Sequence, residues 1–222
     1  LSPSVERVLA FRPDLVLVGQ GTDIRVLQSL EGLGVPTFAV HPKTVEEVLR
    51  AILDVGRLCG AESQAGHLEA ELRSRLRAVS EKTGGLSEAE KPRVLYGYPE
   101  VPMHTAGGRT FIGDLIRLAG GKNIAEDNPM EWPTLNLEAI IKADPEVIIS
   151  GYSSDYLSAE EARRRWEVLK HQPVWREVAA VKANRIHILN LDLLLRPGPR
   201  VFAGLEQVAR CLHPELFAST PR

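Results

Sequence analysis

Motifs that hold phosphates or place a catalytic nucleophile are incomplete in this chain. Gly19 and Gly21 follow an apolar run, but the third glycine of a G-x-G-x-x-G loop would fall at Ile24. The stretch "AGGKN" lacks the spacing and the hydroxyl residue of a phosphate-binding loop, and no G-x-S-x-G occurs. We therefore predict that the protein is not an enzyme. An α/β enzyme whose nucleotide motif is unrecognisable is the alternative.

The histidines show no metal-binding spacing either. The sequence has six of them, at His41, His67, His104, His171, His187 and His213. A protein site for bare zinc brings several ligands together at characteristic short spacings, and these histidines are scattered. We expect no metal held by the protein alone and no resident cofactor.

Two stretches of the chain share one pattern and carry acidic residues at matching positions. They are "VERVLAFRPDLVLVG" at 5–19 and "LEAIIKADPEVIISG" at 137–151. Ser4 and Asn136 precede them and can each cap a helix. Glu6 and Glu138 then fall in the first turn, where the positive end of the helix dipole favours a carboxylate.

Each copy then turns from a helix into a strand. Pro13 and Pro145 stop the helices, an apolar run predicts a buried parallel strand, and Gly19 and Gly151 end it. A duplicated helix–strand unit predicts two similar α/β lobes.

Further alternating helix and strand signals fill the rest of the chain. We predict helices at 22–33, 44–58, 62–83, 110–119, 158–170, 173–180 and 198–212, and strands at 35–40, 93–98 and 185–190. The helix at 62–83 has an apolar stripe and would be about 33 Å long at ~1.5 Å per residue. It can be a surface helix or, as we favour, a rigid link between lobes.

The predicted fold is therefore α/β, with two Rossmann-like lobes joined by one long helix. The expected domains are an N-terminal lobe at 1–60, a bridging helix at 61–85 and a C-terminal lobe at 86–222. The second half has a strand and helix before Asn136 that the first half lacks before Ser4. We expect the N-terminal lobe to be incomplete and the chain to be N-terminally shortened.

Composition describes an ordinary globular chain and excludes some partners. Hydrophobic residues make up 44% and charged residues 25%, and the net charge is −2. That charge gives no sign of a nucleic-acid partner. Cys59 and Cys211 can form a disulfide or be two thiols, and we favour thiols.

Several segments in order resemble one protein family. They are "SVERVLAFRPDLVLV", "LEGLGVPTFAV", "TVEEVLRAILDVGRLCG", "GDLIRLAGGKNIA", "PTLNLEAIIKADPEVIIS", "PVWREVAAVKANRIHIL" and "RPGPRVFAGLEQVARCLHPELF". Their order and spacing are similar to those of the periplasmic-binding-protein family of ABC importers for cobalamin, ferric siderophores and haem. The resemblance covers essentially the whole chain.

The resemblance implies a carrier and its partners. It implies a substrate-binding protein that delivers a metal chelate to an ABC permease, with cobalamin favoured, then ferric siderophore, then haem. Glu6 and Glu138 match the glutamates that pair with permease arginines in the cobalamin-binding member. Their alternative role is only to complement the helix dipole. The expected protein is a monomer, periplasmic or extracellular and lipid-anchored.

We expect the ligand site in the cleft between the lobes, in loops that follow strand ends. Aromatic side chains suit a flat macrocycle or catecholate, and an arginine can meet carboxylate or amide oxygens. Trp132 and Asp192 match positions that resemble cleft residues of the cobalamin binder, and His104 can be a ligand to haem. The candidates are Gln20, Tyr96, Tyr98, His104, Trp132, Tyr152, Asp192 and Arg196.

Overall fold

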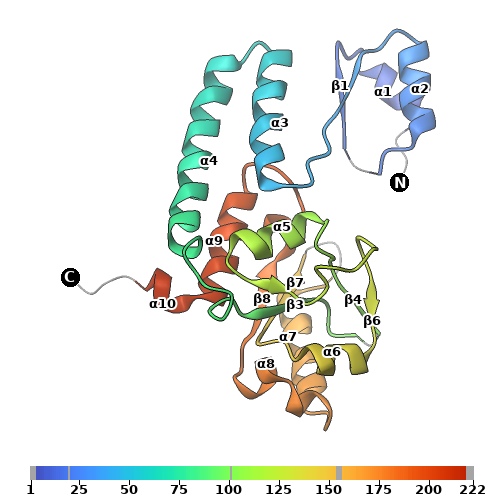
Figure 1. Ribbon diagram of the computed structural model, residues 1–222. Coiled ribbons are helices and arrows are strands. Elements are labelled where there is room, and N and C mark those ends of the chain that lie inside the picture. Colours follow the sequence, from blue (N-terminus) through green and yellow to red (C-terminus); the bar gives the residue numbers. More distant parts are fainter. Residues whose placement is uncertain (1–3, 20, 101, 154–156, 219–222) are drawn as a thin grey trace. The chain divides into compact units, whose positions relative to one another are not determined.

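The computed structural model describes residues 4–19, 21–100, 102–153 and 157–218. The chain forms two compact units, Leu1–Pro42 and Lys43–Arg222. Each unit contains helices and parallel strands, so the predicted α/β class is confirmed (Figure 1). The expected lobes at 1–60, 61–85 and 86–222 stay a prediction. In the described residues, no helix is both long and apolar enough to cross a bilayer.

The first unit is a small helix–strand pair repeated once. Its elements are α1 (Val5–Ala10), β1 (Val16–Val18), α2 (Ile24–Gly32) and β2 (Thr37–Ala39). The two strands pair in parallel, with Leu17 opposite Phe38. Ser4 caps α1 by accepting a hydrogen bond from the backbone N–H of Arg7, as predicted. The helix ends at Ala10, before Pro13, since Arg12 leaves the helical conformation with a φ of 47°.

A four-stranded parallel sheet forms the centre of the second unit. Its order is β5 (Lys122–Asn123), β3 (Arg93–Tyr96), β7 (Val147–Tyr152) and β8 (Ile186–Asn190). Successive residues of the inner strands face opposite sides of the sheet. Val94 and Tyr96 pack in one hydrophobic cluster, whereas Leu95 packs in another. Both faces are therefore covered.

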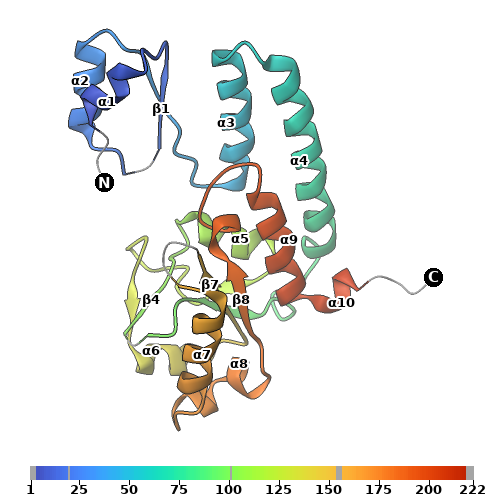
Figure 2. The same cartoon turned by 180° about the vertical axis from the view of Figure 1, so that it is seen from behind.

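Helices cover the two faces of this sheet, as Figures 1 and 2 both show. One side has α5 (Phe111–Leu118) and α9 (Val201–Leu212), whose apolar residues share a cluster with α3 and α4. The other side has α6 (Leu137–Ala143), α7 (Ala159–Lys170) and α8 (Ala179–Lys182). There Trp166 and Trp175 meet edge to face at 5.7 Å within the second cluster. The short α10 (Pro214–Phe217) follows α9.

A helical hairpin begins the second unit. It consists of α3 (Val45–Leu58) and α4 (Glu62–Thr83), and α4 has the predicted bounds. The helices approach closely because Gly56 has no side chain: a Cβ there would lie 2.3 Å from Cβ of Ala65. Arg75 of α4 forms a 2.8 Å ion pair with Glu206 of α9. The hairpin is thus fixed to the body of its own unit.

Two sequence predictions in this unit were wrong. We expected Gly151 to end its strand, but β7 continues through it to Tyr152. Glycine is needed inside the strand because a Cβ there would lie 2.0 Å from Cδ2 of Leu191. The helix expected at 173–180 is instead a 3₁₀ turn at Trp175–Glu177 followed by α8, since extended Val178 separates them.

Candidate ligand site

Most predicted site residues of the second unit lie where its parallel strands end. Tyr96 is the last residue of β3, and Tyr98 follows it by two positions. Tyr152 ends β7 and is opposite Asn190, the last residue of β8. Asp192 lies just beyond, in the 3₁₀ turn Leu191–Leu193. The carboxyl ends of parallel strands meet at one edge of a sheet, so the fold brings these residues to one edge.

The two tyrosines at this edge contact each other. Their hydroxyl oxygens lie 3.3 Å apart, and the rings meet edge to face with centroids 6.0 Å apart. Tyr96 is buried and belongs to the core, and burial raises the pKa of its phenol well above the usual range. Tyr98 is only partly buried. Of the pair, Tyr98 is therefore the one that can reach a ligand.

Asp192 and Arg196 form an ion pair at the same edge. Arg196 Nε lies 2.9 Å from Oδ1 of Asp192, and the arginine side chain is 57% exposed. The turn that carries Asp192 is fixed because its backbone N–H donates to Oδ1 of Asn190 at 2.9 Å. A polar ligand can compete for the exposed guanidinium.

His104 lies on a separate two-stranded ladder, and Trp132 lies in the bend two residues before it. The ladder pairs β4 (Met103–His104) antiparallel with β6 (Thr134–Leu135), and His104 is opposite Thr134. His104 is exposed, and its Nδ1 lies 3.1 Å from Oγ1 of Thr134. Trp132 is 49% exposed. The ladder thus presents an imidazole to solvent, and the bend that leads into β6 presents an indole.

The ladder lies against the end of β3, and therefore near the tyrosines. A Cβ on Gly97 would lie 2.4 Å from Sδ of Met103 and 3.2 Å from the carbonyl oxygen of His104. Gly97 immediately follows Tyr96. The structure thus brings the ladder and the carboxyl edge of the sheet together within the second unit.

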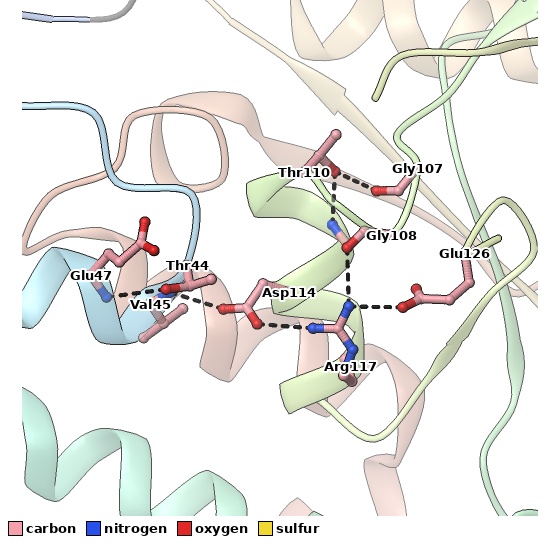
Figure 3. Close-up of polar contacts among 10 residues, drawn as sticks. Thr44, Val45, Glu47, Gly107, Gly108, Thr110, Asp114, Arg117 and Glu126 are labelled. Carbon is pink, nitrogen blue, oxygen red and sulfur yellow. Dashed lines mark hydrogen bonds and ion pairs between the residues drawn. The ribbon is translucent and has the colours of Figure 1, made fainter. Parts of the chain in front are cut away.

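A polar network that the sequence did not reveal fixes the loop beside this ladder (Figure 3). Asp114 of α5 accepts the backbone N–H of Val45 at 2.9 Å and pairs with Arg117 at 3.0 Å. Arg117 also donates to the carbonyl of Gly108 at 3.0 Å and to Glu126 at 2.8 Å. Burial raises the pKa of Asp114, although the Val45 N–H and Arg117 oppose that rise.

Glu6 and Glu138 occupy equivalent places in their two helices. Each is the second helical residue, and each is exposed. Asn136 caps α6 by accepting the N–H of Ala139, as Ser4 does in α1. The Ser4 hydroxyl donates to Glu6 and lowers the pKa of that carboxyl. Both carboxylates are available to an external partner, each within its own unit.

The remaining expectations concern Gln20 and metals. Gln20 lies outside the described residues. Within the described ranges, no group of three or more His, Cys, Asp or Glu side chains could hold a metal ion. Two surface pockets of about 350 and 380 Å³ lie elsewhere in the second unit, and no predicted site residue lines either one.

Comparisons with known proteins agree with this architecture. A substrate-binding lipoprotein of an ABC transporter from Bacillus subtilis, YvrC, is 28% identical over 98% of this chain and 67% of its own length. A cobalamin-binding protein from Halobacterium salinarum is 30% identical over 95% of this chain, which spans only 56% of that protein. The crystal structure of the periplasmic vitamin B12 binding protein BtuF of Vibrio cholerae superposes with a TM-score of 0.74 at 25% identity, covering 95% of this chain and 78% of that one.

The family assignment follows from the match along the sequence. The model of the family described as periplasmic binding protein matches residues 1–192, which is most of the chain. The parallel sheets, the long α4 and the capped repeat at Glu6 and Glu138 are consistent with it. The chain belongs to the periplasmic binding protein family.

Proposed function

We propose that this chain is the substrate-binding protein of an ABC importer, and that it carries a metal chelate to the permease without catalysis. The family match over residues 1–192 carries this proposal. The names of the B. subtilis and H. salinarum relatives support it. The alternative of an α/β enzyme has no support in these comparisons.

Cobalamin is the favoured ligand, followed by a ferric siderophore and then haem. The cobalamin-binding relative and the vitamin B12 binding structure support the first place of cobalamin. The chemistry of the second unit suits a large flat ligand, because Trp132, Tyr98 and Tyr152 offer aromatic surface near one sheet edge. Arg196, paired with Asp192, offers donors for amide or carboxylate oxygens. Gln20 lies outside the described residues and stays a prediction from the sequence.

The partners of this function are a permease dimer and the chelate. The exposed carboxylates of Glu6 and Glu138 are proposed to pair with permease arginines, one from each unit. We propose that the carrier works as a monomer in the periplasm or, lipid-anchored, outside the cell. The lipoprotein named in B. subtilis supports the second location.

A chelate panel tests the ligand proposal. The full chain is equilibrated by dialysis against cyanocobalamin, haemin and ferric siderophores of the hydroxamate and catecholate types, and bound chelate is read from its visible absorbance. Retention of cyanocobalamin above the others supports the favoured order. Retention of none of these chelates contradicts the proposed function.

Two histidine variants show whether the ladder forms part of the site. His104 and His171 are both exposed, but His171 caps α7 far along the chain. We expect His104→Ala to weaken retention of the bound chelate and the matched His171→Ala to leave it unchanged. Equal behaviour of the two variants would remove His104 from the site.

A further inference from the structure

Lys43, the first residue of the second unit, binds carboxylates through both its backbone N–H and its side chain. Its N–H donates to Oε2 of Glu47 at 2.6 Å, in the first turn of α3. Its Nζ forms a 2.6 Å ion pair with Oε1 of Glu131, 88 positions later in the sequence. Glu131 immediately precedes Trp132. The point at which the chain enters the second unit is therefore linked to the segment that carries Trp132 and leads into β6.

Glu131 is also fixed through its backbone. Its carbonyl accepts the N–H of Gly107 at 2.8 Å, and the carbonyl of Pro133 accepts the N–H of Thr105 at 3.0 Å. These bonds hold the backbone on both sides of Trp132, whose own side chain is half exposed. The Lys43 contact adds a side-chain restraint that comes from a distant part of the sequence.

A second contact fixes the same entry point. The N–H of Val45 donates to Asp114, and Arg117 connects Asp114 to Gly108 and Glu126 (Figure 3). The start of α3 is thus held by the network on one side and by Glu131 on the other. A displacement of residues 43–45 would act on the loop that carries Trp132.

We propose that the Lys43–Glu131 ion pair positions Trp132 for the ligand. Through this pair, the first residue of the second unit is linked to the ligand site. This rests on the proposed function, in which Trp132 contacts the chelate. Lys43 is a positioning residue that acts through Glu131. The pair is partly exposed, at 50% and 39% of the two side chains, so its effect should be modest and sensitive to salt.

Removing the charge of Lys43 tests whether the ion pair contributes to ligand affinity. With cyanocobalamin as the probe, Lys43→Gln should weaken binding about two- to fivefold, the range of an exposed ion pair. Arg57→Gln is the matched control, because Arg57 forms an exposed ion pair with Asp54 at 3.0 Å within α3 itself. That control should bind as the wild type does.

Tryptophan quenching gives a readout that a merely structural role would not move. Trp166 and Trp175 are buried at 2% and 0% exposure, so acrylamide quenching of the free protein reports chiefly on Trp132. We expect the quenching constant to rise in Lys43→Gln and to stay unchanged in Arg57→Gln. Trp132→Phe supplies the baseline.

A charge exchange completes the test. Lys43→Glu alone should weaken binding more than Lys43→Gln, and the double variant Lys43→Glu/Glu131→Lys should recover affinity and quenching to within about twofold of the wild type. If Lys43→Gln changes neither property relative to Arg57→Gln, or only lowers thermal stability, the positioning proposal is wrong. If the wild type does not bind cyanocobalamin but the quenching changes as stated, the ligand proposal fails and the positioning of Trp132 stands.

Discussion

The backbone N–H of Val45 donates to Oδ2 of Asp114 at 2.9 Å, joining two residues that are 69 positions apart. Val45 is the first residue of α3, where helix N–H groups have no partner within the helix. Asp114 supplies that partner from α5, and its side chain is only 13% exposed. The helical hairpin is therefore fixed to the body of the second unit by a charged acceptor.

Removing the Asp114 carboxyl should destabilise the second unit. Asp114→Ala leaves the Val45 N–H and Arg117 without this acceptor, which should cost about 1–3 kcal/mol at pH 7. Asp114→Asn keeps one acceptor and should cost less. Urea denaturation followed by circular dichroism measures both. A neutral effect of Asp114→Ala would contradict the role of this contact.

The difference in stability between Asp114→Asn and the wild type should change with pH in one direction. Burial raises the folded-state pKa of Asp114 above its usual value of 3.8, so the folded state binds this proton more tightly than the unfolded chain. The stabilisation from that proton is present below pH 3.8 and is lost as pH rises through the folded pKa. The stability of Asp114→Asn relative to the wild type should therefore improve as pH rises above 3.8. An opposite slope would contradict the direction of the shift.

Two glycine-to-alanine changes should have opposite effects. A Cβ on Gly113 of α5 would lie 2.6 Å from the carbonyl oxygen of Gly107, so Gly113→Ala should destabilise by about 1–3 kcal/mol. A Cβ on Gly66 of α4 meets nothing within 4 Å, so Gly66→Ala should stabilise by about 0.5–1 kcal/mol through helix propensity. Thermal melts of the two variants check this, and an unchanged or raised melting temperature of Gly113→Ala would contradict the packing of α5 on its preceding loop.

The cysteines should differ in reactivity. Both are free; Cys59 is exposed, whereas burial raises the pKa of Cys211 to about 11. A thiol reagent at pH 8 should modify Cys59 quickly and Cys211 only slowly, because the thiolate is the reactive form. The denatured, unreduced protein should show two thiols. If no thiol is found, the two cysteines form a disulfide and the prediction of two free thiols is wrong.

Glu6→Ala and Glu138→Ala test the docking proposal. Both residues are exposed, so each variant should keep the wild-type fold and chelate affinity. Binding to the reconstituted permease should fall for each, fall further for the double variant, and weaken with salt. Glu62→Ala is the matched control, since Glu62 is also an exposed first-turn glutamate. Normal permease binding by the double variant would mean that the two glutamates only complement their helix dipoles.

Local signals predicted much of the fold. Helix α4 begins and ends at the predicted residues, and the caps at Ser4 and Asn136 form as expected. At the start of α3, Thr44 accepts the N–H of Glu47, and the Glu47 carboxylate accepts the N–H of Lys43. These features depend on neighbours within a few residues, which a sequence displays directly.

Contacts across long sequence separations could not be predicted in the same way. The bonds Val45–Asp114 and Lys43–Glu131 join residues 69 and 88 positions apart, and no periodicity marks them. The strands β4 and β6 have two residues each, too few for an alternating pattern. Gly151 resembled a strand end because the close approach of Leu191 is invisible in the sequence. The rule that ligands bind at the carboxyl ends of strands did bring Tyr98, Tyr152 and Asp192 to one edge.

Isothermal titration of the full chain with cyanocobalamin, haemin and ferric siderophores measures whether the chain binds a metal chelate. We predict one-to-one binding of at least one chelate with a dissociation constant of about 1 μM or tighter, equivalent to about −8 kcal/mol. Trp132→Ala should weaken that binding at least tenfold, the loss expected when an aromatic anchor is truncated. Absence of binding to every chelate, or full affinity in Trp132→Ala, would contradict a metal-chelate site built on this ladder and sheet edge.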